Sequence, residues 1–207
     1  NVQDHPLVAE LEAELAPVVT HLTDETAYQA FYASIADTGA IASPEVWLDP
    51  ATCTPRARWL GDWIATKAPR ATIVDVGCFD GVVSIALLKM CPSARYTGVD
   101  ISAEAVARLN VRLAEHGLAD RARGLHGSYT TLIAPGTADV VIWTEVIEHV
   151  PDPRAEIEKL GRLLKPGGHL LMSTPWGSFD HGHPPGKTDH GTPRGHRGHV
   201  RALTARD

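Results

Sequence analysis

The chain is poor in the features that define several common classes of protein. It has only three cysteines in 207 residues, an odd number without paired spacing, which argues against a disulfide framework and predicts reduced thiols. No apolar run approaches the ~20 residues that a membrane-spanning helix needs. The first residues also lack the basic and then apolar pattern of a secretory leader. We therefore expect a cytoplasmic protein without a membrane span.

Positive charge is scarce as well. The 19 lysines and arginines are outnumbered by 25 acidic residues, which gives a formal net charge of −6 with histidine neutral. This balance disfavours a broad phosphate-binding face, and with it nucleic acid as a partner, although a small basic patch is compatible with it. The length fits one domain, or one domain with an extension, that can bury a core without disulfides or metals. The oligomeric state is left open, with a homodimer as one option.

Helical and strand-like patterns alternate from residue 56 onward. The helical patterns cover 56–67, 81–91, 102–117 and 153–164, and the strand patterns cover 73–76, 96–100, 121–127, 138–144 and 169–174. Such repetition predicts an α/β fold, a Rossmann-like three-layer sandwich whose mostly parallel sheet has helices on both faces. Residues 1–55 are predicted to form a helical extension or lid, with a helix over 5–36. Residues 56–207 are predicted to form the core, with a His-rich loop at 176–199.

The run from residue 71 to residue 81 is the most informative segment. An apolar β-branched strand leads into a turn that contains Asp75, Gly77 and Gly81, and a helical pattern follows at once. Open α/β sheets form nucleotide-sized sites in this way, at the carboxyl end of the first strand. The turn lacks the extra glycine that helps to seat a pyrophosphate, and the acid at Asp75 suits a ligand with a cationic end. The pattern therefore disfavours a nicotinamide-dependent oxidoreductase.

Two later strand ends also carry acidic residues. Asp100 ends the second strand, where a carboxylate can accept two hydrogen bonds from a ribose diol or cap the following helix. Glu145, Glu148 and His149 follow the fourth strand, where catalytic groups lie in doubly wound folds. Two interpretations of these three residues remain open. In the first, Glu148 and His149 fix a turn beneath the cofactor by hydrogen bonds. In the second, two carboxylates and an imidazole lie on one side of a helical turn and bind a divalent metal.

Together these motifs resemble the class I S-adenosylmethionine (SAM)-dependent methyltransferases, over about residues 56–204. The resemblance rests on the turn after the first strand, on the Glu-His-Val-x-Asp-Pro pattern within 143–153, and on the run 162–175. It implies SAM as the cofactor, bound by Asp75, Gly77, Cys78, Phe79, Asp80, Asp100, Ile101, Ser128, Tyr129 and Glu145.

The sequence also departs from the pattern of this family. Phe79 stands where the family usually has a second glycine, and Ser128 where it often has an acid for the adenine amine. The family normally has a further helix and two more strands, so we expect the C-terminal strands to be missing or the chain to be an unusually short member.

The resemblance further implies an enzyme that methylates a small molecule, with a hydroxyl oxygen of a secondary metabolite, sugar or quinone as the favoured acceptor. His149 or His199 would be the general base, since histidine titrates near neutral pH. Residues 143–153 also resemble small-RNA 3′-end methyltransferases and some quinone-ring O-methyltransferases. This similarity implies Mg²⁺ or another divalent metal bound by Glu145, Glu148, His149 and His199. The alternatives are a metal-dependent RNA 3′-terminal methyltransferase and a non-catalytic SAM-binding module.

Overall fold

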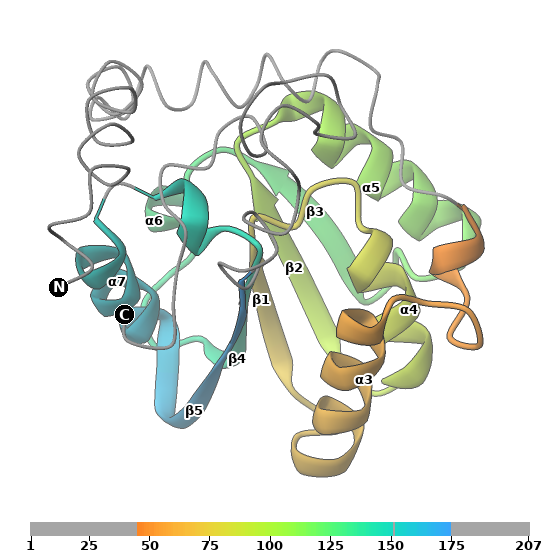
Figure 1. Ribbon diagram of the computed structural model, residues 1–207, viewed down its shortest axis with the longest axis horizontal. Helices are drawn as coiled ribbons and strands as arrows, with labels where there is room; N and C mark the ends of the chain where they lie inside the picture. The colour runs from red at the N-terminus through yellow and green to blue at the C-terminus, as the bar shows by residue number, and fades with distance from the viewer. Residues whose placement is uncertain (1–44, 151, 175–207) are drawn as a thin grey trace, which may run out of the picture.

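A parallel sheet with helices on both faces forms the described part of the protein (Figure 1). The computed structural model describes residues 45–150 and 152–174. Within these ranges five parallel strands lie in the order β3-β2-β1-β4-β5, and they are β1 (Thr72–Val76), β2 (Arg95–Asp100), β3 (Ala122–His126), β4 (Ala138–Thr144) and β5 (Leu164–Ser173). The predicted Rossmann-like α/β fold is confirmed. The helix predicted over 5–36 and the loop predicted over 176–199 lie outside the described residues.

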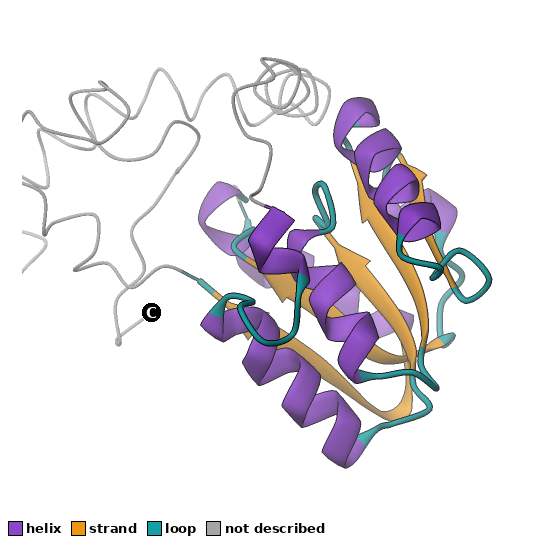
Figure 2. Cartoon of the chain, turned by 90° about the vertical axis from the view of Figure 1, so that its right-hand side faces the viewer, coloured by secondary structure: helices purple, strands orange, loops and turns teal. Residues whose placement is uncertain are grey.

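The helices form two outer layers around this sheet, as Figure 2 shows. Three of them pack on one face: α3 (Pro55–Lys67), α4 (Val82–Met90) and α5 (Ala103–Glu115). The other face carries the short α6 (Tyr129–Leu132) and α7 (Pro153–Leu163). Two 3₁₀ helices complete the described elements, η2 (Glu45–Leu48) and η3 (Ile147–His149). None of the helices in the described ranges is long and apolar enough to cross a membrane.

The helix starts follow from their capping residues. The side chains of Thr54, Ser102 and Asp152 each accept a hydrogen bond from the backbone N–H three residues further on. Such caps satisfy backbone donors that the first turn of a helix leaves without partners. The predicted cap at Ser102 is confirmed, and α5 ends before Gly117, which adopts the left-handed conformation at φ 66°.

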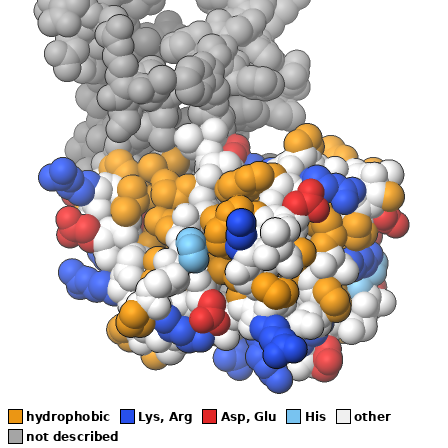
Figure 3. All heavy atoms as spheres, turned by 90° about the horizontal axis from the view of Figure 1, so that it is seen from below, with side chains coloured by type: hydrophobic (Ala, Val, Ile, Leu, Met, Phe, Trp, Pro, Cys, Tyr) orange, Lys and Arg blue, Asp and Glu red, His pale blue; other side chains and the backbone are white. Residues whose placement is uncertain are grey.

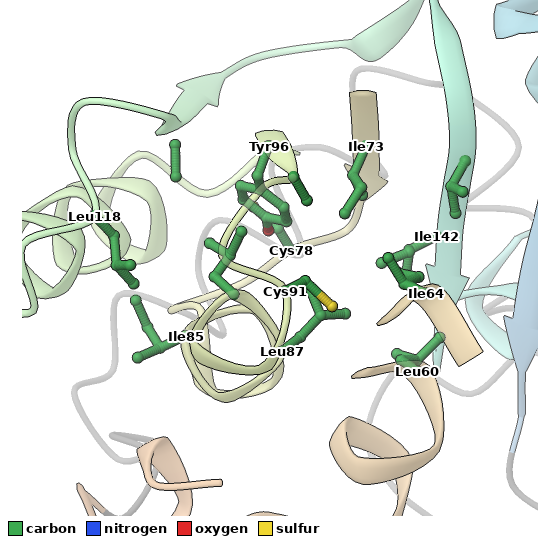
Figure 4. Packing of buried hydrophobic residues seen from close by; sticks show 14 of the residues in the cluster. Leu60, Ile64, Ile73, Cys78, Ile85, Leu87, Cys91, Tyr96, Leu118 and Ile142 are labelled. Atoms are coloured by element: carbon green, nitrogen blue, oxygen red, sulfur yellow. The ribbon is translucent and has the colours of Figure 1, made fainter. Parts of the chain in front are cut away.

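Residue alternation along β1 divides the core between the two faces of the sheet. Ile73 packs with the cluster under α3, α4 and α5, whereas Val74 and Val76 pack with the cluster under α7. Figure 4 shows the first of these clusters from close by. Because both faces of the sheet are covered, its central strands read as continuous apolar runs. Asp75 interrupts the apolar run of β1, since it is an acid that is only 3% exposed and lies on the α4 side.

The structure differs from the sequence prediction at β5. This strand begins at Leu164 instead of residue 169, because Leu164 already pairs with Ala138 before the regular pairing of β4 with β5. The register of the β4–β5 pairing shifts between Ala138 and Val140. In the corresponding part of β5, Gly167 adopts φ 79°. The Pro-Gly-Gly sequence thus forms an irregularity within a strand.

Candidate functional site

The strand order reverses beside β1, and this reversal places the candidate site. The sheet continues from β1 to β2 and β3 on one side, and to β4 and β5 on the other. Ligands of open α/β sheets bind outside the carboxyl ends of the strands at such a switch point. The residues predicted to bind a cofactor lie at or directly after the carboxyl ends of β1, β2, β3 and β4 (Figure 1). The fold therefore brings these segments to one edge of the sheet.

The turn after β1, residues 77–81, contains three left-handed residues, and we call it the glycine turn. The φ angles of Gly77, Phe79 and Gly81 are 79°, 48° and 82°. A β-carbon on Gly77 would lie 2.5 Å from Cγ2 of Val146, which belongs to the loop after β4. Glycine is thus required at position 77 because of its positive φ and because a β-carbon would collide with Val146, whether or not a ligand approaches the turn.

Asp100, at the end of β2, holds the glycine turn from the next strand. Its Oδ2 accepts a hydrogen bond of 2.8 Å from the N–H of Phe79, and its Oδ1 accepts one of 2.9 Å from the N–H of Ser102. Burial raises the pKa of this carboxyl, while the backbone donors act in the opposite direction. A carboxylate has about four acceptor positions, so these contacts leave capacity for a diol. The predicted ribose-binding role is compatible with this geometry and stays a prediction.

Asp75 lies beneath the glycine turn in a buried cluster of three oxygen-bearing side chains. Its Oδ2 accepts hydrogen bonds from Tyr96 at 2.8 Å and from Ser84 at 3.0 Å, and the two hydroxyl oxygens lie 2.6 Å apart. Two hydroxyl protons cannot serve all three contacts, so a proton on Asp75 would complete the ring. Burial raises the pKa of Asp75 to about 6, although the bonds from Tyr96 and Ser84 oppose this effect.

Replacing Asp75 by asparagine is therefore expected to change how stability depends on pH. The native carboxyl keeps its proton up to about pH 6, whereas the ordinary pKa is 3.8, so the native state binds more protons between these values. The stability of the unmodified protein should fall relative to Asp75→Asn as the pH rises from about 4 to about 7, by up to about 3 kcal/mol. Urea unfolding of both proteins across this range measures the difference. A difference that does not vary with pH would contradict the elevated pKa.

Glu145, directly after β4, forms an ion pair that the sequence did not reveal. Its Oε1 lies 2.9 Å from Nη1 of Arg56, in the first turn of α3, and accepts a hydrogen bond of 2.8 Å from Oγ of Ser173. About a third of each charged side chain is exposed, 31% for Arg56 and 33% for Glu145. The Nε of Arg56 is buried and has no hydrogen-bond partner among the described residues. An acid and a guanidinium with a spare donor thus lie side by side near the glycine turn.

The proposed metal ligands are only partly described. Glu148 and His149 belong to η3, and His199 lies outside the described residues. Among residues 45–150 and 152–174, no group of three His, Cys, Asp or Glu side chains is arranged to hold a metal ion. Glu145 is paired with Arg56 instead. The metal set and the general-base role of His149 or His199 therefore stay predictions.

Two side chains of the glycine turn are engaged inside the protein. Asp80 is fully buried, and its Oδ2 lies 2.8 Å from Nη1 of Arg112. Cys78 is also buried, and its sulfur would lie 2.7 Å from a β-carbon placed on Gly98. Figure 4 shows Cys78 next to Tyr96. Burial raises the pKa of the Cys78 thiol well above its usual range, so this residue has the properties of a small packing residue and not of a nucleophile.

The candidates after β2 and β3 also have partners within the protein. The Oγ of Ser128 lies 2.8 Å from the hydroxyl of Thr130, at the start of α6. Tyr129 is a core residue, 7% exposed, whose hydroxyl donates to Glu156. The carbonyl oxygen of Ile101 lies 3.2 Å from a ring nitrogen of His126. Their predicted contacts with a cofactor stay predictions.

The opposite edge of the sheet offers no comparable arrangement in the part of the chain that is described. A shallow pocket there is lined by Ala68, Pro69, Arg70, Ala71 and Asp139. Lys165 neutralises Asp139 through two contacts of 2.8 Å. Figure 3, which views the molecule from below, shows basic and acidic side chains interspersed with apolar ones.

An open parallel sheet with a glycine turn and an acidic second-strand end at its switch point is the arrangement of nucleotide-binding α/β domains, a class that includes the class I methyltransferases. A family model described as a methyltransferase domain matches residues 51–207. This match covers most of the chain, and the chain belongs to that family.

Curated relatives agree with this assignment. The chain is 36% identical over 115 residues to a ubiquinone biosynthesis O-methyltransferase of Ralstonia nicotianae, a match that covers 55% of this chain and 48% of the relative. It is 37% identical over 102 residues to the enzyme of the same name from Colwellia psychrerythraea, covering 49% and 41%. The chain thus spans about half the length of the curated relatives it matches.

The fold is also similar to that of a geranyl diphosphate C-methyltransferase from Streptomyces coelicolor. That structure was solved with Mg²⁺, geranyl diphosphate and S-adenosyl-L-homocysteine. The TM-score is 0.59 at 21% identity, and the match covers 72% of this chain and 65% of the other. At this identity the similarity supports the fold alone.

Proposed function

We propose that the protein is a SAM-dependent methyltransferase that methylates a hydroxyl oxygen of a small molecule of quinone type. The observation that carries the proposal is the set of charged groups around the glycine turn. Asp100 lies on one side of this turn, and the Arg56–Glu145 pair lies near it at the end of β4. Family membership and the names of the curated relatives give independent support.

The residues present fit the chemical parts of SAM. The ribose diol requires an acceptor, and the Asp100 carboxylate has acceptor positions left. The amino-acid end of SAM carries one positive and one negative group. Arg56 and Glu145 provide the opposite charges side by side, and Arg56 has a buried donor, Nε, without a partner among the described residues. These three residues would therefore hold the two ends of the cofactor.

SAM supplies a methyl group that its sulfonium already activates, so the protein has two tasks, alignment and proton removal. Alignment would rest on the glycine turn, whose left-handed residues are fixed by contacts with neighbouring strands. A hydroxyl acceptor must lose its proton, and a histidine imidazole can take it. His149 ends η3 directly after β4, at the same edge of the sheet as Asp100. It is the candidate for this role within the described residues.

Three further elements of the proposal are not needed to explain the charged groups around the glycine turn. A divalent metal bound by Glu145, Glu148, His149 and His199 would require Glu145 to leave its pair with Arg56. A cytoplasmic location and a lid formed by residues 1–55 are expectations from the sequence.

Calorimetry and a transfer assay test the proposal together. We expect SAM and S-adenosylhomocysteine to bind, NAD to show no binding, and S-adenosylhomocysteine to accumulate with a catechol or hydroquinone acceptor. The same assay with added magnesium and with a chelator tests the metal. Binding without turnover on any acceptor would favour a binding module. Salt-sensitive methylation of an RNA 3′ end would favour the RNA enzyme, because phosphate contacts weaken with salt.

A further inference from the structure

A buried arginine connects the glycine turn to two other parts of the fold. Nη1 of Arg112, on α5, lies 2.8 Å from Oδ2 of Asp80 and donates at 3.0 Å to the backbone carbonyl of the same residue. Its Nη2 lies 3.0 Å from Oε1 of Glu45, in η2. Asp80 is fully buried and Arg112 is 7% exposed, whereas Glu45 is largely exposed. The guanidinium thus binds both the side chain and the main chain of one residue in the turn.

The residue directly before Asp80 adopts an unfavourable backbone conformation. Phe79 has φ 48°, and a bulky residue in the left-handed region costs about 1–2 kcal/mol. Such a conformation persists only where the surroundings enforce it. Two sets of contacts do so here. The N–H of Phe79 is held by Asp100 at 2.8 Å, and the following residue is held by Arg112.

We infer that Arg112 is a positioning residue for the cofactor site, which acts through Asp80 to keep Phe79 in the left-handed conformation. This inference rests on the proposed SAM binding for its functional consequence. When Phe79 is in this conformation, its N–H reaches Asp100, the predicted ribose acceptor. Arg112 therefore fixes the mutual position of the turn and of that carboxylate before any cofactor binds.

The planar guanidinium is essential to this role. It directs one nitrogen to Asp80 and another to Glu45, an arrangement that the single ammonium of lysine cannot reproduce. Arg112→Lys keeps the positive charge next to the buried Asp80 and so avoids leaving that carboxylate without a counterion. The variant should fold and yet hold the turn less firmly.

The Phe79→Gly substitution distinguishes a positioning role of Arg112 from a general contribution of Arg112 to stability. Glycine adopts positive φ without steric cost, so this substitution removes the strain that Arg112 counteracts. We expect Arg112→Lys to weaken S-adenosylhomocysteine binding about tenfold in the otherwise unmodified chain, but less than about threefold in the Phe79→Gly background. Calorimetry on the four proteins of this double-mutant cycle measures the coupling between the two sites, and contacts of the Phe79 ring with the ligand cancel in the comparison.

Arg108→Lys is the matched control. Arg108 lies one turn earlier on α5, and its ion pair of 3.0 Å with Glu104 stays within that helix. We expect less than about a twofold change in binding in either background. If Arg112→Lys fails to fold, Asp80→Asn removes the charge at the other end of the same pair and should show the same dependence on Phe79. Equal losses in both Phe79 backgrounds would overturn the inference.

Urea unfolding of the same four proteins keeps this inference separable from the proposed function. If the unmodified protein does not bind S-adenosylhomocysteine, the proposed function fails. The role of Arg112 is then judged by stability alone. Arg112→Lys should lower the free energy of unfolding less in the Phe79 background than in the Phe79→Gly background, because Phe79 can then leave the left-handed conformation and the released strain offsets part of the lost contact. Equal decreases would overturn it.

Discussion

Replacing His149 by alanine is expected to lower kcat for methyl transfer by about 100-fold or more and to leave the dissociation constant of SAM within about threefold. A positioned general base contributes roughly 10²–10⁴ to a rate, whereas His149 is not among the residues expected to hold SAM. His149 ends η3, after Glu145 and the carboxyl end of β4. Single-turnover assays with a hydroquinone acceptor, together with calorimetry on the same samples, separate the two effects.

His116→Ala provides the control for this experiment. His116 is the C-cap of α5 and so lies toward the edge of the sheet that is remote from the glycine turn. We expect its removal to leave kcat and SAM binding unchanged within about twofold. The same assay on His199→Ala decides between the two histidines. Full activity of His149→Ala would remove His149 from the mechanism, and a parallel loss of kcat and of SAM affinity would indicate a structural role.

The order of the strands and helices could be predicted because each carries a local signal. The strands buried on both faces are continuous apolar runs, and Ser102 and Gly117 mark the two ends of α5. The elements that were missed are short and depend on tertiary contacts. The four-residue α6 is an example, since Tyr129 contributes to it by packing into the core and bonding Glu156 on α7. No local pattern specifies such a contact.

The placement of the candidate residues at one edge of the sheet was also predictable, but the partners of their side chains were not. Asp75, Asp100 and Glu145 occur at or just after strand ends, and parallel strands bring these ends to one edge. The pair between Arg56 and Glu145 depends on where α3 packs, which the sequence does not specify. Asp80 was expected to contact a cofactor, and the structure shows its carboxylate buried against Arg112. Only the three-dimensional packing of α5 under the turn reveals this partner.

Phe79 departs from the family pattern, and yet the turn around it keeps a left-handed conformation. A glycine at this position would adopt the left-handed conformation without steric cost. The structure shows the same conformation with phenylalanine, at φ 48°, held on one side by Asp100 and on the other by the Asp80–Arg112 pair. The strain is thus compensated by charge-assisted hydrogen bonds, which are about twice as strong as neutral ones. The conformation of the turn therefore depends on Asp100 and Arg112, which belong to other elements of the fold.

Replacing Asp100 by alanine is expected to weaken S-adenosylhomocysteine binding by about 100-fold. Each hydrogen bond from a ribose hydroxyl to a carboxylate contributes about 1.5–3 kcal/mol, and the substitution also frees the N–H of Phe79. Asp100→Asn keeps one oxygen acceptor and should lose less affinity. Asp139→Asn is the matched control, because Asp139 is a partly exposed acid, paired with Lys165, at the opposite edge of the sheet.

Deoxynucleosides distinguish a direct contact of Asp100 with the ribose from an indirect effect through Phe79. Adenosine should compete with S-adenosylhomocysteine for the unmodified protein better than 2′-deoxyadenosine or 3′-deoxyadenosine does, because each deoxy compound lacks one donor to the carboxylate. In Asp100→Ala the three nucleosides should compete equally, because the acceptor is gone. If the variant still prefers adenosine by the same factor, Asp100 does not bind the diol, and its loss acts only through the backbone of the glycine turn.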